Sequence, residues 1–452
     1  MYFKKSNILI IFSLFFLVAF LISLPKTKSY LLPERTIILK NNINVLKWPP
    51  IRESINQIKT VWDLKEEMIL TQKDFLEINL MDMAVYLYQK GIQKEKYVIK
   101  AKGANDDFGE TPIGLFRILN KEIEHYSSWA YVYMPNSMRF TGNYYLHGLP
   151  YYANGQLTGA TYSSGCVNLY SEPAKNLYDL IPRNLPVLVL EKDFLNDDYI
   201  YHKPLKTLPS ISAQSYLVAD VDSSQILYEK NRSTFVSAGT ITNKFITGIS
   251  ASENSLLSFD YIFTTKIPIN ANAILYKEDR VWPIGERIPY IDLFYPMIIE
   301  HSANAAEALA QSRLGHGYEY ALNERAKSMG LNNTFISDAG GYDLNNLTNA
   351  EDIFLLSRYL LKNKTWMLEI SKGVLYPKFG QPYFSEPYNN KNIFYQKENF
   401  LGGYYDLGQA GLENGFGIFK ISLDGTERSI AIVLLQSQDI KSDTEKNLKS
   451  FC

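Results

Sequence analysis

Hydrophobic and polar residues alternate over short runs in the first half of the chain, which is the pattern of β-strands. Every second residue from Leu76 to Leu80 is apolar, and this opens the pattern. Further strand-like runs are expected at 84–88, 97–99, 114–118, 130–133, 143–147 and 186–190. One helix is predicted over 171–180, ahead of the last strand. Residues 73–195 are therefore predicted to form a compact, mostly β domain.

The pattern changes to helical spacing in the second half of the chain. Helices are predicted at 244–253, 290–300, 303–313, 318–329 and 349–361. Strand pairs flank them at 216–220 with 226–228, and at 417–423 with 428–435. The last pair is joined by Asp424-Gly425, a good hairpin turn. Residues 213–452 are therefore predicted to form an α/β domain, in which the terminal strands make one sheet and the helices pack on it.

The N-terminal segment is apolar from residue 8 to residue 24 and follows two lysines. A helix of this length covers about 25 Å, the low end for crossing a bilayer. An uncleaved anchor is favoured because no Ala-x-Ala site follows, and a cleaved signal peptide is the alternative. In either case we expect the remainder to be exported. The segments predicted outside the two domains are a cytoplasmic tip and anchor at 1–29, a stalk at 30–72 and a linker at 196–212.

Composition narrows the classes of function. The chain carries 46 basic and 47 acidic residues with no long basic run, which argues against nucleic-acid binding. Its two cysteines, Cys166 and Cys452, mean that an exported chain of this kind relies on its cores rather than on disulfides. The histidines other than His147 show no metal-ligand spacing, so neither a metal nor a cofactor is expected. The oligomeric state is left open.

Cys166 lies in the segment Ser163-Ser164-Gly165-Cys166-Val167-Asn168, nineteen positions after His147. Backbone N–H groups in a small turn that contains glycine can bind an anion beside a thiolate. A histidine on a neighbouring strand can accept the thiol proton, which completes the minimum apparatus for acyl transfer through a thioester. The alternative is that Cys166 is a small buried hydrophobic residue.

Residues 75–195 resemble the catalytic domain of the L,D-transpeptidases (YkuD type) of bacterial cell-wall enzymes. The family motif is a histidine, about fifteen residues, and then Ser/Thr-His-Gly-Cys-hydrophobic-Asn, which corresponds to His147-Gly148 and 163–168 here. Residues 111–118 resemble the family's Thr-Pro-x-Gly strand, and 134–140 resemble its Met-Pro segment. The match spans the whole domain in the right order.

This resemblance implies that Cys166 is the nucleophile, that His147 is the base and that the Gly148 carbonyl orients the imidazole. It also implies an oxyanion hole and substrate contacts, formed by Ser163, Ser164, Gly165, Asn168, Arg139 and the backbone N–H of Cys166. In the family the thiolate attacks the third residue of the peptidoglycan stem peptide and releases the terminal D-alanine. An amine or water then resolves the thioester. Ser164 replaces the second histidine of the motif, so substrate placement and thiol activation are expected to differ.

Residues 212–440 resemble the penicillin-binding D-alanyl-D-alanine carboxypeptidases of the serine-peptidase type. Ser302 and Asn304 match the family's Ser-x-Asn segment. The Ser-x-x-Lys motif is matched with Thr240 at the serine and Asn243 at the lysine, and Lys-Thr-Gly is matched with 409–411, where Gln409 replaces the lysine. Lys244, four residues after Thr240, could face the same side of a helix. The resemblance therefore implies a pseudo-enzyme, with Ser302 and Asn304 left as polar contacts for stem peptides or a partner.

Together these observations predict a peptidoglycan L,D-transpeptidase whose partners are stem peptides and the membrane. It would be a single-pass protein of the bacterial inner (cytoplasmic) membrane, with its domains on the outer side of that membrane. Two alternatives stay open: hydrolysis by the same site, as in an L,D-carboxypeptidase, and a non-catalytic scaffold that binds peptidoglycan.

Overall fold

The computed structural model describes residues 57–104, 109–128, 130–159, 161–191, 199, 210–253, 265–274, 279–375, 388–407, 411–423 and 425–451. The expected membrane anchor, most of the expected stalk and linker, Gln409 and Cys452 lie outside these residues. Within the described ranges, no helix is long and apolar enough to cross a membrane. Residues 55–452 form one compact unit.

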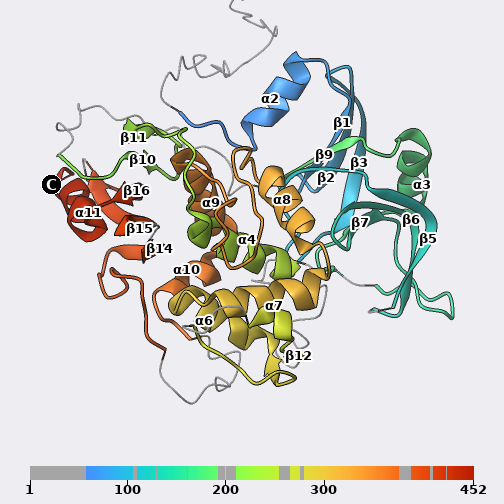
Figure 1. Ribbon diagram of the computed structural model, residues 1–452. Coiled ribbons are helices and arrows are strands. Elements are labelled where there is room, and N and C mark those ends of the chain that lie inside the picture. The colour runs from blue at the N-terminus through green and yellow to red at the C-terminus, as the bar shows by residue number, and fades with distance from the viewer. Residues whose placement is uncertain are drawn as a thin grey trace, which may run out of the picture. The chain divides into compact units, whose positions relative to one another are not determined.

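The first part of this unit, residues 63–191, is here named the β domain (Figure 1). Its elements are α2 Asp63–Leu70, β1 Phe75–Asn79, β2 Ala84–Gln89, β3 Ile92–Ala101, β4 Gly114–Arg117, β5 Asn120–Ser127, β6 Val132–Thr141, β7 Tyr144–His147, β8 Val167–Leu169, α3 Ser171–Leu180 and β9 Pro186–Leu190. The strands form one sheet in the order β4-β9-β1-β2-β3-β8-β7-β6-β5. The mostly β architecture and the helix predicted over 171–180 are confirmed, and α2 is a second helix, ahead of the predicted start of the domain at residue 73.

Strand β1 differs from the predicted alternation because all five of its residues are buried. Glu77 is buried because Lys65 of α2 pairs with its carboxylate at 3.0 Å and Asn79 donates to it at 3.0 Å. The helix α2 therefore covers the face of the sheet that the sequence pattern marked as polar. A second apolar cluster, which includes Phe75 and Tyr88, fills the space beneath this helix.

The second part, residues 210–451, is here named the α/β domain. Its strands are β10 Ser215–Asp220, β11 Ile226–Lys230, β12 Lys266–Pro268, β13 Arg287–Pro289, β14 Phe400–Leu407, β15 Glu413–Leu423 and β16 Thr426–Ser437. Its helices are α4 Gly239–Glu253, η2 Ala271–Ala273, η3 Tyr290–Leu293, α6 Phe294–Ile299, α7 Ala303–Leu314, α8 Tyr318–Ser328, α9 Ala350–Asn363, α10 Thr365–Ser371 and α11 Ile440–Lys449.

Five strands of the α/β domain form a sheet in the order β11-β10-β16-β15-β14, so the first and last strands of the domain pair as predicted. Helices α4, α9 and α10 pack on one face, with Leu217 and Phe416 in the core between them and the sheet. Helix α11 covers the other face, over a cluster that includes Phe419 and Ile432. The predicted architecture of a sheet with packed helices is confirmed.

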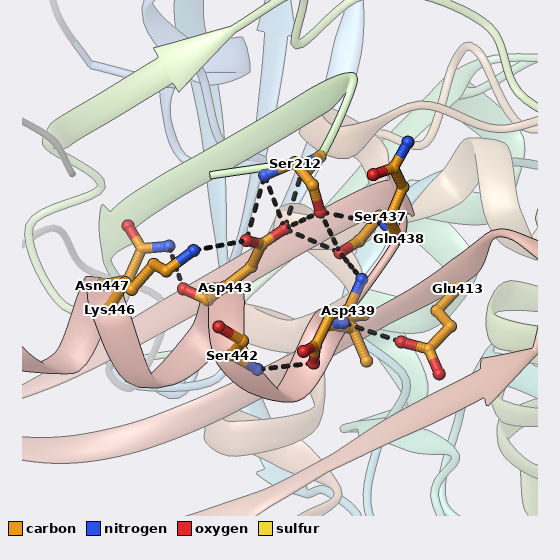
Figure 2. A network of polar contacts seen from close by, with 11 residues as sticks. Ser212, Glu413, Ser437, Gln438, Asp439, Ser442, Asp443, Lys446 and Asn447 are labelled. Atoms are coloured by element: carbon orange, nitrogen blue, oxygen red, sulfur yellow. Dashed lines mark hydrogen bonds and ion pairs between the residues drawn. The ribbon is translucent and has the colours of Figure 1, made fainter. Parts of the chain in front are cut away.

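The first residues of the α/β domain are fixed to its last helix by Asp443 (Figure 2). The Asp443 carboxylate accepts hydrogen bonds from the backbone N–H of Ser212 at 2.9 Å and of Ala213 at 3.0 Å. The hydroxyls of Ser212 and Ser437 donate to it at 2.6 and 2.7 Å. This cluster joins the residues just before β10 to α11 and to the end of β16.

Candidate active site

Parallel pairing of β7 with β8 places His147 beside the strand that directly follows Cys166. His147 lies opposite Asn168 in the register, and Leu146 lies opposite Val167. Side chains of paired residues share a face and alternate along the strand, so Cys166, two residues before Asn168, lies on the same face as His147. Cys166 packs against a cluster that includes Tyr145, two residues before His147, and this agrees with the placement. The predicted Cys/His pair is thus brought to one surface of the sheet.

The orientation of the His147 ring is set by its neighbour in sequence. The Nδ1 atom lies 2.6 Å from the carbonyl oxygen of Gly148, which can only accept, so Nδ1 carries the proton and Nε2 carries the lone pair. The Gly148 N–H donates to Pro135 at 2.8 Å, and this holds the carbonyl in place. Burial lowers the pKa of His147 to about 4, against the opposite effect of the Gly148 hydrogen bond. The imidazole is therefore neutral at pH 7 and able to accept a proton.

The turn before Cys166 is held by the side chain of Ser163. Its hydroxyl donates to the Cys166 carbonyl and accepts from the Gly165 N–H at 3.1 Å. Gly165 has φ of 106°, a conformation that residues with a side chain rarely adopt. Because the Gly165 N–H is engaged, Ser164 and Cys166 are the predicted oxyanion donors that remain for a substrate. Ser164 itself is exposed, so a substrate can reach it.

The resting thiol is protonated. Burial raises the pKa of Cys166 to about 11, and a backbone hydrogen bond from Tyr145 opposes this only in part. The Sγ atom lies 4.0 Å from the Asn143 carbonyl oxygen, a contact that suits a thiol donor. With His147 also neutral, the two groups rest as thiol and imidazole.

Two other predicted contacts lie on the same face of the sheet. Arg139 is opposite Tyr145 in the pairing of β6 with β7. Asn168 is buried, and its Oδ1 has no hydrogen-bond partner among the described residues. The face that carries Cys166 therefore also carries a guanidinium and an amide oxygen, both suited to a polar peptide. Their roles stay predictions.

In the α/β domain, helix α4 carries Asn243 and Lys244 of the second predicted site, and their side chains have different surroundings. Asn243 donates to the Asp338 carbonyl at 2.6 Å and to Asn346 at 2.8 Å, so its amide is used inside the fold. Lys244 is fully buried and donates to the Gly340 carbonyl at 2.8 Å. Burial lowers the pKa of Lys244 to about 8, although nearby carboxylates, the largest effect coming from Asp406, act to raise it. Lys244 is therefore the cationic side chain that lies near these carboxylates, and Asn243, which the motif comparison placed at the lysine position, carries no charge.

The residue three positions before Lys244 is Ile241, which is buried and has no hydroxyl. Ser302 and Asn304 are also buried. The Ser302 hydroxyl donates to Asp279 at 3.0 Å, and the Asn304 amide donates to the Arg280 carbonyl at 3.1 Å. Both side chains thus fasten the 279–280 segment in this conformation. Their contact with a stem peptide stays a prediction, and Gln409 lies outside the described residues.

Two features near Cys166 were not identified from sequence: the Tyr144 ring and the Glu110 carbonyl. The ring and the carbonyl both lie against Gly165. A cavity of about 730 Å³, lined by residues of both domains, includes Asn143 and Tyr144 in its lining but not Cys166 or His147. A glycine at position 165 indicates that other groups pack closely against the turn, but the sequence does not identify those groups.

The comparisons with known proteins divide the chain in the same way. Residues 73–189 match the family model of the L,D-transpeptidase catalytic domain, and residues 202–417 match that of D-alanyl-D-alanine carboxypeptidase. Both segments match the families that their motifs resemble. The comparison with curated proteins gives no match.

Solved structures similar to the chain include penicillin-binding proteins. Penicillin binding protein 6B from Escherichia coli is 16% identical, with a TM-score of 0.46, and the match covers 57% of this chain and 80% of that one. Penicillin binding protein 5 from Haemophilus influenzae is 19% identical, with a TM-score of 0.46, and the match covers 54% of this chain and 71% of that one.

Proposed function

We propose that the β domain is a peptidoglycan L,D-transpeptidase that works through a thioester on Cys166. The observation that carries the proposal is the placement of Cys166 and His147 on one face of the sheet, with His147 Nδ1 bound to the Gly148 carbonyl. This tautomer leaves the Nε2 lone pair as the base. The match of residues 73–189 to the family supports the same reading.

The proposed reaction has two halves. In the first, Cys166 Sγ attacks the carbonyl of the third stem residue and its proton passes to His147 Nε2. The amide bond to the terminal D-alanine breaks, and the leaving amine takes this proton from His147. In the second, an amine of a neighbouring stem attacks the thioester and gives its proton to His147, which returns it to sulfur as the C–S bond breaks.

We propose that the α/β domain performs no acyl transfer. A serine nucleophile activated by lysine needs both groups within hydrogen-bond reach on one helix turn. Here Ile241 stands one turn before Lys244, and the Lys244 amine is bound to the Gly340 carbonyl. Thr240, four residues before Lys244, is the remaining hydroxyl on that side of α4 and is the group that a test must exclude.

We also propose that the chain is held in the bacterial inner membrane by residues 8–24, with both domains on the outer side. This rests on the apolar run and its flanking lysines. Carbonate extraction of membranes tests the anchor: retention in the pellet supports it, and release into the supernatant contradicts it.

The activity test uses the full-length chain in mild detergent, with Cys452→Ser to remove the second thiol. The protein is incubated with purified disaccharide-tetrapeptide, and products are identified by mass spectrometry beside a Cys166→Ala control. A cross-linked dimer absent from the control supports the transpeptidase. Loss of D-alanine without cross-linking indicates water as the acceptor and an L,D-carboxypeptidase. Binding without turnover would replace both with the scaffold.

A second variant separates an impaired enzyme from a scaffold. Ser164 is exposed and stands where the family has a histidine, so the larger side chain has room. Ser164→His is expected to raise turnover by about tenfold or more, the scale of one positioned polar side chain. A scaffold would stay inert.

A further inference from the structure

Residues 109–114 lie between the Cys166 turn and the α/β domain, and the α/β domain holds this segment at two points. The Glu110 carboxylate pairs with the amine of Lys364, which lies between α9 and α10, at 3.0 Å. The carbonyl of Ile113 accepts from Arg325 of α8 at 3.2 Å. Both cationic side chains belong to the α/β domain, which is proposed to perform no acyl transfer.

The same segment supports the Cys166 turn from behind. The Thr111 hydroxyl accepts from the Gly103 N–H at 3.0 Å, and Gly103 forms a β-bridge with Ser163. Ser163 in turn donates to the Cys166 carbonyl. The Glu110 carbonyl oxygen would lie 2.9 Å from a Cβ on Gly165, so the segment packs directly on the turn. A continuous set of contacts therefore joins Lys364 to Cys166.

Arg325 and Lys364, the two residues of the α/β domain that hold the segment, are themselves held in place by buried contacts. Arg325 is buried and paired with Glu253 through two hydrogen bonds of 2.7 and 2.8 Å. The Lys364 side chain is 4% exposed, whereas Glu110 is 30% exposed. Burial acts to lower the pKa of Lys364, and the carboxylates of Glu110 and Glu253 more than offset this, so the pKa is raised. Lys364 is therefore protonated at neutral pH and can pair with the Glu110 carboxylate.

We propose that Lys364 is a positioning residue for Cys166: through Glu110 it holds segment 109–114 against the turn that carries the nucleophile. The α/β domain then acts on the reaction as a support that sets the place of the thiol. A misplacement of about 1 Å at a reacting atom is enough to cost about a hundredfold in rate. The proposal rests on the proposed function for its effect on turnover, but not for its effect on the thiol.

The test compares Lys364→Met with Lys362→Met in the full-length chain. Lys362 is a matched control because it lies two residues away and pairs with Asp222, inside the α/β domain. Lys364→Met is expected to lower kcat about tenfold to a hundredfold with little change in KM, and Lys362→Met to leave both unchanged. Glu110→Gln should reproduce the loss, the double variant should add nothing to it, and Lys364→Arg should restore most of the activity.

A second readout does not require turnover. The rate of Cys166 alkylation by iodoacetamide, followed from pH 6 to pH 9, should change at least about threefold in Lys364→Met and Glu110→Gln and stay the same in Lys362→Met. Thermal melting confirms that each variant is folded. If folded Lys364→Met and Glu110→Gln keep the wild-type kcat and alkylation profile, the proposal is overturned. If no variant and no wild type turns over, the alkylation arm still decides it.

Discussion

A Cβ atom on Gly165 would lie 2.1 Å from Cε1 of the Tyr144 ring. Real side chains do not approach so closely, and Tyr144 is itself buried, so the ring cannot move away at low cost. The φ of 106° at Gly165 adds a second reason for glycine at this position. The residue before the nucleophile is therefore fixed by packing as well as by backbone conformation.

Gly165→Ala is expected to lower kcat by about a hundredfold or more, because the turn must shift to relieve the contact and carries Cys166 with it. The strain should also cost about 1–3 kcal/mol in the free energy of unfolding. Steady-state kinetics and urea unfolding measure the two effects. Gly155→Ala is the matched control, since Gly155 also has a positive φ of 82° but has nothing within 4 Å of an added Cβ. A wild-type kcat in Gly165→Ala would contradict the packing argument.

The pH dependence of thiol reactivity follows from the neutral resting pair. With the pKa of Cys166 raised to about 11 and that of His147 lowered to about 4, the thiolate fraction should rise about tenfold per pH unit across pH 6 to 9. The rate of iodoacetamide alkylation in the Cys452→Ser protein measures this fraction. A plateau above pH 5 would mean that thiolate and imidazolium already exist at rest, contrary to the prediction.

The sequence can point to the candidate Cys166 site because the residues of the motif lie close together in the chain. The spacing from His147 to Cys166 is fixed in the motif, and adjacent strands then bring the two side chains to one face. The three-residue strand β8 was not predicted, since it is defined by pairing with β3 and β7 rather than by its own pattern. Strand β5, at the edge of the sheet, was missed because none of its residues is buried.

Contacts between distant parts of the chain left no signal in the sequence. Lys364 and Glu110 are 254 positions apart in the sequence, and nothing in the local sequence around either residue indicates that the two form a pair. Glu77 stands at a polar position of the alternating pattern, but Lys65 of α2 pairs with it and it is buried. In both cases the partner is supplied by tertiary packing, which no period of hydrophobic residues records.

Asp443→Asn is expected to destabilise the α/β domain by about 2–3 kcal/mol, because a charged acceptor of several hydrogen bonds becomes a neutral group with one acceptor oxygen. Although burial acts to raise the pKa of Asp443, hydrogen bonds from Ser212, Ser437 and Ala213 lower it below the usual value. The stabilisation is therefore complete above about pH 4 and lost as the pH falls through the folded-state pKa. Urea unfolding at pH 7 and at pH 3 measures this.

Asp439→Asn controls for the loss of a charge on the same helix, since Asp439 caps α11 through one hydrogen bond of 2.9 Å to the Ser442 N–H. It is expected to cost less than Asp443→Asn. Equal unfolding free energies for Asp443→Asn and wild type at pH 7 would show that the cluster in Figure 2 contributes nothing to stability.

The α/β domain is expected to form no covalent adduct with a fluorescent penicillin. Lys244 is three residues after Ile241, which offers no hydroxyl, and its amine is held by the Gly340 carbonyl. Acylation would therefore need Thr240, one position further away along α4. The measurement is in-gel fluorescence of the full-length Cys166→Ala protein, so that the thiol of the β domain cannot contribute. A labelled band that disappears in Thr240→Ala would show that Thr240 and Lys244 form a working pair and would end the assignment as a pseudo-enzyme. A band that persists in Thr240→Ala would place the nucleophile elsewhere in the chain.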